Sequence, residues 1–402
     1  MRALRILQER LHGSLTFMHA KRCVALWRAV AGLLQGQRLW LTALGRSLPG
    51  ETSDKHRIKA VDRLVGGAGM QGAVPQLYAA LAAFLLRCVR RPVLLIDWTG
   101  VEPGFAVLSA KVCFRGRALS ICSQTFPDSR KCSPTAEREF LQRLAQVIPV
   151  QCRPILVTDA GFLFPWFDAV RAHGWDFIGR LRGRVRLLLD GKWKPLADVH
   201  ALATRLPREL GHVLVGRGSP RSEKRVILSG KPRLKGRSKL GRKGARGEST
   251  ADHQRSAAAR EPLVLVTSLV DSSRSVVDAY RMRMQIEETF RDLKSHRYGW
   301  SAEDIRSRDP KRIDVLLLIA AFASLVSHII GLAAAERQFQ RYFQANTVRT
   351  RSVFSTFFLG NLTLARGRES DLPAHSLRAA LTQVGRLLAA AALDGTPRAR
   401  AP

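Results

Sequence analysis

The chain has 402 residues, 46% of them hydrophobic, so it can bury a large core and form two or three domains. Lysine and arginine number 66 against 32 aspartates and glutamates, which gives a formal charge of +34. This excess is too large for an ordinary soluble enzyme and indicates a polyanionic partner, either nucleic acid or an anionic membrane surface.

Nucleic acid is favoured over a membrane. The longest apolar run, Val315 to Val326, is too short to span a bilayer and predicts a buried helix. Met1 to Glu9 alternates basic and apolar residues and lacks the apolar core of a secretory signal. The six cysteines contain no Cys-x-x-Cys pair and no zinc spacing. We therefore expect reduced thiols in a cytosolic protein.

Residues 1–90 are expected to form a helical DNA-binding region. Leu4, Leu7 and Leu11 recur at helical spacing. Ser53 and Asp54 can cap a helix that begins KHRIKAVDRL. The basic side of that helix carries Lys55, His56, Lys59 and Arg63. This side predicts contacts with DNA, and a solvated charged face is the alternative.

Residues 91–180, together with 261–305, are expected to form a catalytic core. Strands are predicted at Val93–Ile96, Phe105–Phe114, Ala118–Thr125, Pro154–Thr158 and Trp175–Gly179, with helices at 133–147 and 161–172. Asp97 follows the first strand and Asp159 follows the fourth. This order is typical of a ribonuclease H-like mixed sheet, so the predicted fold class is α/β with helical regions on both sides in sequence.

Residues 181–260 interrupt this core as a β-rich basic insertion. Short strand-like pieces are visible, and Arg217 to Gly247 holds twelve cations with Glu223 as its only acid. A DNA-contacting loop is favoured there over a disordered surface loop. Residues 306–402 predict helices at 313–332, 349–364 and 377–393, which complete the core, pair subunits, or do both.

The stretch from Tyr280 to Lys294 predicts one continuous helix, because it contains no proline or glycine. Tyr280, Arg283, Glu287 and Lys294 fall within a sector of about 60° on that helix. Gln285, Glu288 and Asp292 lie roughly opposite its apolar stripe and are expected to be solvated. For this stretch alone, a surface ion-pair ladder between Arg283 and Glu287 is the simpler interpretation.

Three acids form the candidate catalytic group. Asp97, Asp159 and Glu287 supply oxygen ligands that suit two Mg²⁺ or Mn²⁺ ions, which promote phosphoryl displacement on DNA. Taken singly, Asp97 is also explained as a turn residue and Asp159 as a helix cap. The competing acids Asp128, Asp176 and Asp190 do not directly end a strongly apolar strand.

The pattern Tyr280-x-x-Arg283-x-x-x-Glu287-x-x-x-x-x-x-Lys294 resembles in full the signature of bacterial DDE transposases of the insertion-sequence-four family. LLIDWTG and ILVTDAGF resemble the contexts of the first two catalytic acids, and KHRIKAVDRLVG resembles the N-terminal DNA-binding segment. The resemblance implies catalysis by Asp97, Asp159 and Glu287 with Mg²⁺. It also implies phosphate contacts from Tyr280, Arg283 and Lys294.

Such enzymes cut both ends of a mobile element and join the 3′ ends to new DNA within a dimeric protein–DNA complex. The resemblance thus implies double-stranded DNA as partner, a homodimer on DNA, and a location on the bacterial nucleoid in the cytoplasm. Ala160 departs from the family, which often has arginine there. In some relatives a tryptophan in the insertion stabilises a flipped base while a DNA hairpin forms. Trp193 is the only tryptophan well inside this insertion, so the residues support a hairpin intermediate only weakly. Two alternatives are a non-catalytic DNA-binding protein derived from a transposase and a hydrolytic nuclease without strand transfer.

Overall fold

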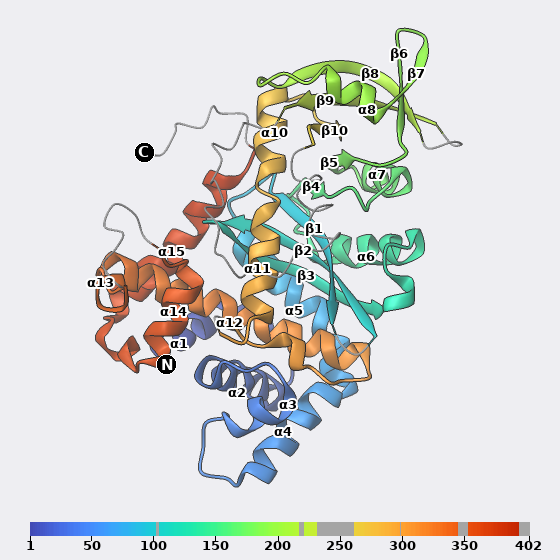
Figure 1. Cartoon of the computed structure of the whole chain (residues 1–402). Helices are drawn as coiled ribbons and strands as arrows, with labels where there is room; N and C mark the ends of the chain where they lie inside the picture. The colour runs from blue at the N-terminus through green and yellow to red at the C-terminus, as the bar shows by residue number, and fades with distance from the viewer. Residues whose placement is uncertain (102–103, 217–220, 231–260, 298, 345–352, 394–402) are drawn as a thin grey trace, which may run out of the picture. The chain divides into compact units, whose positions relative to one another are not determined.

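The computed structural model describes residues 1–101, 104–216, 221–230, 261–297, 299–344 and 353–393. The chain divides into two compact units (Figure 1). The first unit contains Met1–Ile155 and Met282–Pro402, and the second contains Leu156–Arg281. Each unit is described separately below.

The N-terminal part of the first unit is helical, as predicted. Its helices are α1 (Arg2–Leu11), η1 (His12–Leu15), α2 (Ala20–Gly36), α3 (Leu41–Arg46), α4 (Asp54–Gly66) and α5 (Ala68–Leu86). Ser53 is the N-cap residue of α4, as the sequence indicates, and its hydroxyl lies 2.8 Å from Nδ1 of His56. Helix α4 packs through Val61 and Leu64, which are both buried.

Three antiparallel strands form the sheet of the first unit in the order β3-β2-β1. They are β1 (Val93–Val101), β2 (Phe105–Phe114) and β3 (Arg117–Pro127). Arg115 and Gly116 both have positive φ, 47° and 77°, which suits the tight turn between β2 and β3. The first strand is longer than predicted, because its pairing with β2 continues to Val101. Asp97 therefore lies within β1 rather than at its end.

The remaining helices of the first unit include a long apolar helix, α12. They are α6 (Pro134–Val147), α11 (Met284–Lys294), α12 (Pro310–Glu336), α13 (Gln340–Phe343), α14 (Thr356–Ala365) and α15 (Ala374–Ala391), with short turns η2 (Asp128–Arg130), η3 (Ala302–Asp304) and η4 (Arg368–Asp371). Helix α12 packs against α2, α5, α14, α15 and β3 (Figure 1). Its residues are apolar on nearly every side, which is the pattern of a helix enclosed by others.

Two described helices, α5 and α12, are long and apolar enough to cross a membrane by length and composition alone. The apolar run Val315 to Val326 is too short to cross a bilayer, but the whole helix α12 has 27 residues. Its length therefore does not exclude a membrane-spanning helix. Its most apolar window is 94% buried inside the protein, and that of α5 is 61% buried. This burial is the property of core helices, and it agrees with the buried helix predicted there.

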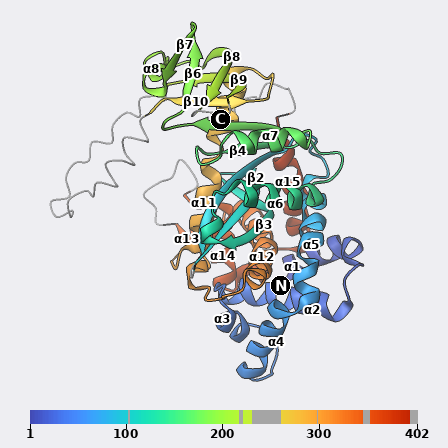
Figure 2. The ribbon, with the colours of Figure 1, turned by 90° about the vertical axis from the view of Figure 1, so that its right-hand side faces the viewer.

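The strands of the second unit neighbour one another in the order β4-β5-β10-β9-β8-β6-β7. The elements of this unit are β4 (Ile155–Thr158), α7 (Phe164–Ala172), β5 (Asp176–Leu181), β6 (Arg186–Leu189), β7 (Lys192–Pro195), α8 (Leu196–Ala201), β8 (Arg208–Gly216), β9 (Ser222–Ser229), β10 (Leu263–Thr267) and α10 (Ser273–Arg281). Strands β6 to β9 lie near α8 in Figure 2. The order β1, β2, β3, α6, β4, α7, β5 confirms the predicted α/β, ribonuclease H-like class. The insertion is β-rich as predicted. Strand β7 and helix α8 were not among the strand-like pieces expected from the sequence. Most of the basic segment 217–247 lies outside the described residues.

The predicted continuous helix from Tyr280 to Lys294 is wrong. Helix α10 ends at Arg281 and α11 begins at Met284. Between them the backbone makes i to i−3 hydrogen bonds, from Gln285 N to Met282 O (2.9 Å) and from Ile286 N to Arg283 O (3.1 Å). No proline or glycine marks this break, so local propensity did not reveal it. Tyr280 consequently belongs to the second unit, whereas Arg283, Glu287 and Lys294 belong to the first.

Candidate active site

Strand β1 holds Asp97 in a defined position on the sheet of the first unit. Asp97 lies opposite Ser109 of β2, whose hydroxyl is hydrogen-bonded to that of Ser123 at 2.9 Å. The backbone N–H of Trp98 donates to Oδ1 of Asp97 at 2.8 Å. Only 15% of the Asp97 side chain is exposed. A carboxylate with this limited exposure and this backbone contact is held in place before any ligand arrives.

Side chains of α11 fasten this helix to the turn end of the β2–β3 hairpin. Gln285 Oε1 accepts a hydrogen bond from Phe114 N at 3.1 Å, and Thr289 Oγ1 accepts one from Ala118 N at 2.8 Å. These contacts satisfy backbone groups where the strand ladder ends. Ile286 and Phe290 are buried beside them. The register of α11 on the sheet is thereby set, and so is the position of Glu287.

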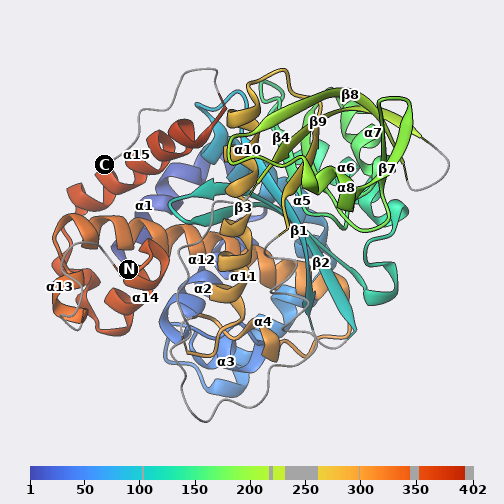
Figure 3. The same ribbon diagram turned by 45° about the horizontal axis from the view of Figure 1, so that its top comes forward.

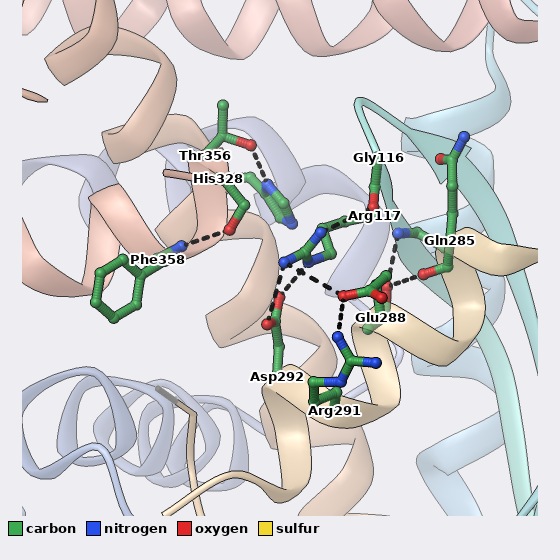
Figure 4. A network of polar contacts seen from close by, with 12 residues as sticks. Gly116, Arg117, Gln285, Glu288, Arg291, Asp292, His328, Thr356 and Phe358 are labelled. Carbon is green, nitrogen blue, oxygen red and sulfur yellow. Dashed lines mark hydrogen bonds and ion pairs between the residues drawn. The ribbon is translucent and has the colours of Figure 1, made fainter. Parts of the chain in front are cut away.

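An ion-pair network around Arg117 strengthens the same attachment (Figure 4). Arg117 Nε lies 2.5 Å from Oδ2 of Asp292, and its Nη2 lies 3.9 Å from Glu288. Asp292 is 8% exposed, and burial raises the pKa of its carboxyl group, an effect that Arg117 opposes. The solvated position predicted for Asp292 is therefore wrong. Its partner lies 175 residues away in the chain, so helical spacing alone did not reveal the pair.

Arg283 connects the two acids of the first unit. Its Nη1 lies 3.4 Å from Oδ2 of Asp97, and its Nη2 donates to Oε1 of Glu287. The side chain of Arg283 is 15% exposed and that of Glu287 is 40% exposed. The pair between Arg283 and Glu287 is the helical ladder expected from spacing. Its extension to Asp97 on a strand shows that the two carboxylates can face a single cation.

Lys294 is the last residue of α11 and is partly exposed. It lines an internal cavity of about 40 Å³ together with Thr99 of β1 and Lys111 of β2. Lys111 is buried, donates to Ser120 Oγ at 2.7 Å, and lies 5.4 Å from the centre of the Phe290 ring. Burial lowers the pKa of Lys111 to about 8. This buried lysine is not apparent from the amino-acid order, because a lysine within an apolar strand has no distinctive pattern.

The second unit contributes Asp159 and Tyr280. Asp159 directly follows β4, as predicted, and its Oδ1 accepts a hydrogen bond from Gly161 N at 2.9 Å. The helix-cap alternative for Asp159 is therefore wrong, because α7 begins at Phe164 with Leu163 as its N-cap residue. Tyr280 lies near the end of α10 and is only 6% exposed. Neither observation assigns these residues a function, so their catalytic and phosphate-binding roles stay predictions.

The competing acids have structural partners. Asp176 Oδ1 accepts from Arg171 and from Ser268 at 2.7 and 2.8 Å. Asp190 has a positive φ of 54° in the β6–β7 turn and pairs with Lys194. Asp128 begins the short turn η2. The contacts of Asp176 and Asp190 give these two acids structural roles, whereas Asp128 directly follows β3, which the sequence did not indicate.

The donor chemistry fits divalent ions, although the described residues contain no group of three or more His, Cys, Asp or Glu arranged to hold a metal. Asp97 and Glu287 are hard oxygen donors, the kind that Mg²⁺ and Mn²⁺ prefer. They already share one cation, the Arg283 guanidinium. Asp159 belongs to the second unit, and its place in a metal site stays a prediction. The metal site therefore stays a proposal, supported by this donor set.

The basic side of α4 is exposed as predicted. Lys55, His56, Lys59 and Arg63 all lie at the surface, while Val61 and Leu64 on the opposite side are buried. The helix is thus amphipathic in the expected sense. Contacts of the four basic residues with DNA stay predictions.

Residues 90–324 match the family model described as transposase DDE domain, which spans more than half of the chain. The chain belongs to this family. The matched region contains Asp97, Asp159 and Glu287. The prediction of a DDE transposase that acts on DNA is thereby confirmed at the level of the family, and with it a nucleic-acid-cleaving enzyme class.

A comparison with curated proteins gives no match. Among solved structures, the chain is similar to a piggyBac transposase in a synaptic complex with hairpin DNA, with a TM-score of 0.39 and 9% identity. The similarity covers 95% of this chain and 78% of that chain.

Proposed function

We propose that the protein is the transposase of an insertion sequence of the insertion-sequence-four family. It binds the terminal inverted repeats of its element and performs metal-dependent cleavage and strand transfer by a cut-and-paste route. The main support for this proposal is the Arg283 guanidinium, which pairs with Asp97 of β1 and Glu287 of α11. This contact supports a shared site for the first and third acids of the signature.

In this proposal Asp97, Asp159 and Glu287 hold the metal. When bound, two Mg²⁺ or Mn²⁺ ions stabilise the attacking and leaving oxygens of the phosphoryl displacement. The Trp98 N–H orients the Asp97 carboxylate. Gln285 and Thr289 keep Glu287 in register by fastening α11 to the hairpin.

The signature cations position the DNA strand. Guanidinium and ammonium groups bind phosphate oxygens, which fixes the register of a strand without reading its bases. Arg283 and Lys294 would serve in this way, with Tyr280 as a hydroxyl donor. The N-terminal helix α4 would bind the element ends through Lys55, His56, Lys59 and Arg63. A homodimer on double-stranded DNA and a cytoplasmic, nucleoid-associated location complete the proposal.

The test is a Glu287→Gln variant assayed for cleavage of element ends with Mg²⁺. We expect cleavage to fall by about 100-fold or more, because an amide is a much poorer metal ligand than a carboxylate, while binding to the ends persists. Glu288→Gln is the matched control, since Glu288 is the neighbouring residue and pairs with Arg291 and Arg117. Wild-type cleavage by the Glu287 variant would remove Glu287 from the metal site.

The two alternatives are separated by further assays. A non-catalytic DNA-binding protein would bind the ends without cutting them in any divalent metal. A hydrolytic nuclease would cut, yet it would not join pre-cleaved ends that carry a free 3′-hydroxyl to a target plasmid. Joined products therefore support the transposase.

A further inference from the structure

Helices α3 and α4 pack together in the first unit (Figure 3). A hollow of about 630 Å³ lies beside them. The segment that leads into α12 forms its other wall. Its apolar lining includes Trp40, Leu41, Val65, Ile305 and Leu316. This volume is within the range of sites that enclose a small organic group. None of these residues belongs to the candidate active site.

Trp40 is the aromatic residue of this lining. It is half-buried and is the N-cap residue of α3. The Arg38 guanidinium lies over its ring, 5.6 Å from the ring centre. Arg38 Nη1 is itself held by Ser301 Oγ at 2.6 Å. The indole is therefore held before any ligand binds, which reduces the entropy lost on binding.

Two arginines at the hollow are available to an anion. Arg306 and Arg308 line it and are exposed, and neither forms a hydrogen bond or ion pair with any residue that the structure describes. The third arginine of the lining, Arg312, is already paired with Asp62.

The two acids of the lining are already engaged. Asp304 lies 3.5 Å from a ring nitrogen of His296. Asp309 accepts a hydrogen bond from Lys311 N at 2.9 Å as the N-cap residue of α12. The lining holds three arginines against these two aspartates, a formal charge of +1, and its two arginines without a partner among the described residues suit a phosphate group.

We propose that this hollow binds an unpaired nucleotide of single-stranded DNA, with its base against Trp40 and its phosphates on Arg306 and Arg308. Aromatic rings that stack bases, combined with cations that bind the backbone, are the recognised basis of sequence-independent single-strand binding. Bases within a duplex are stacked on their neighbours and do not offer a free face to an indole. The choice of DNA as ligand rests on the proposed function.

The test measures binding of a short fluorescein-labelled oligothymidylate by fluorescence anisotropy, without divalent metal so that no cleavage occurs. Trp40→Ala should weaken binding at least fivefold, because losing one stacked base costs a factor of that size or more. Trp40→Phe should retain most of the affinity. The double variant Arg306→Glu/Arg308→Glu should reduce the slope of log K against log salt by about 1.4, since each phosphate contact on a single strand contributes about 0.7.

Matched control variants distinguish binding in the hollow from general effects of positive charge and of exposed aromatic residues. Tyr342 is 69% exposed and has Arg368 over its ring, 4.5 Å from the ring centre, so Tyr342→Ala tests an aromatic–arginine pair outside the hollow. Arg378→Glu/Arg386→Glu reverses two exposed charges on α15. Wild-type affinity for Trp40→Ala, or equal weakening by the control variants, would overturn the proposal. Failure to cut or bind element ends would contradict the proposed function instead, because this assay uses neither.

Discussion

Arg283 makes a contact in the structure that its position in the sequence does not indicate. Spaced four residues from Glu287, it indicates a local pair on a helix surface, which contributes little to stability. In the structure the same guanidinium also reaches Asp97, 186 residues away in the chain. Both side chains of that longer pair are 15% exposed. One cation thereby marks where a strand and a helix bring two candidate metal ligands together.

His328 gives a prediction at the same scale. It is fully enclosed by the first unit, its Nδ1 lies 2.7 Å from Thr356 Oγ1, and burial, assisted by Arg117, lowers its pKa to about 3 (Figure 4). An unfolded histidine titrates near 6.5. The neutral, buried His328 therefore makes its full contribution to the free energy of unfolding above about pH 6.5. This contribution declines as pH falls toward 3, because only the unfolded chain takes up the proton.

This residue should lower the free energy of unfolding by about 2 kcal/mol between pH 6.5 and pH 5. Urea unfolding at both pH values provides the measurement. His328→Gln keeps a partner for Thr356 but cannot titrate, so its stability should change with pH by about that much less. Identical pH dependence in the two proteins would show that His328 does not titrate as its burial indicates.

At the scale of elements, the attachment of α11 to the β2–β3 hairpin is the central feature. A helix of eleven residues is marginal alone, so tertiary contacts must hold it. Those contacts come from Gln285, Thr289 and Asp292, on sides of the helix that are not part of its apolar stripe. The polar residues of this helix therefore determine its register on the sheet.

Thr289→Val tests this attachment. It removes the acceptor of the Ala118 N–H in a buried position, and an unsatisfied buried donor costs about 1–3 kcal/mol. The loss should appear as a lower urea midpoint with an unchanged m-value. Thr382→Val on α15 is the control, because Thr382 also bonds the carbonyl four residues earlier but is exposed. Similar effects of the two substitutions would mean that the contact to the hairpin adds nothing.

At the scale of the whole molecule, charge is the dominant property. A net charge of +34 disfavours self-association and favours a polyanion, and membership in the transposase DDE domain family identifies that polyanion as DNA. The exposed cations of α4 form one defined part of this charge. Their removal should affect binding rather than chemistry.

The double variant Lys55→Glu/Lys59→Glu should weaken binding to the duplex ends of the element. It should also reduce the slope of log K against log salt by about 2, since each lost phosphate contact on a duplex accounts for about 0.9. Titrations at several salt concentrations provide this slope. Reversing Arg378 and Arg386 on α15 controls for net charge alone, and an equal effect of both variants would place α4 outside the interface.

Local patterns determined much of this protein. Apolar runs with β-branched residues predicted the strands that carry or precede Asp97 and Asp159, and spacing predicted the exposed basic side of α4. These features depend on neighbours within one element, so the amino-acid order suffices to find them.

Only the tertiary structure decided the break between α10 and α11, the bridging position of Arg283, and the buried pair of Arg117 with Asp292. The contacts of Arg283 with Asp97 and of Arg117 with Asp292 join residues far apart in the chain, and helical or strand periodicity contains no information about such partners. The break has no proline or glycine to mark it, so the amino-acid order does not reveal it.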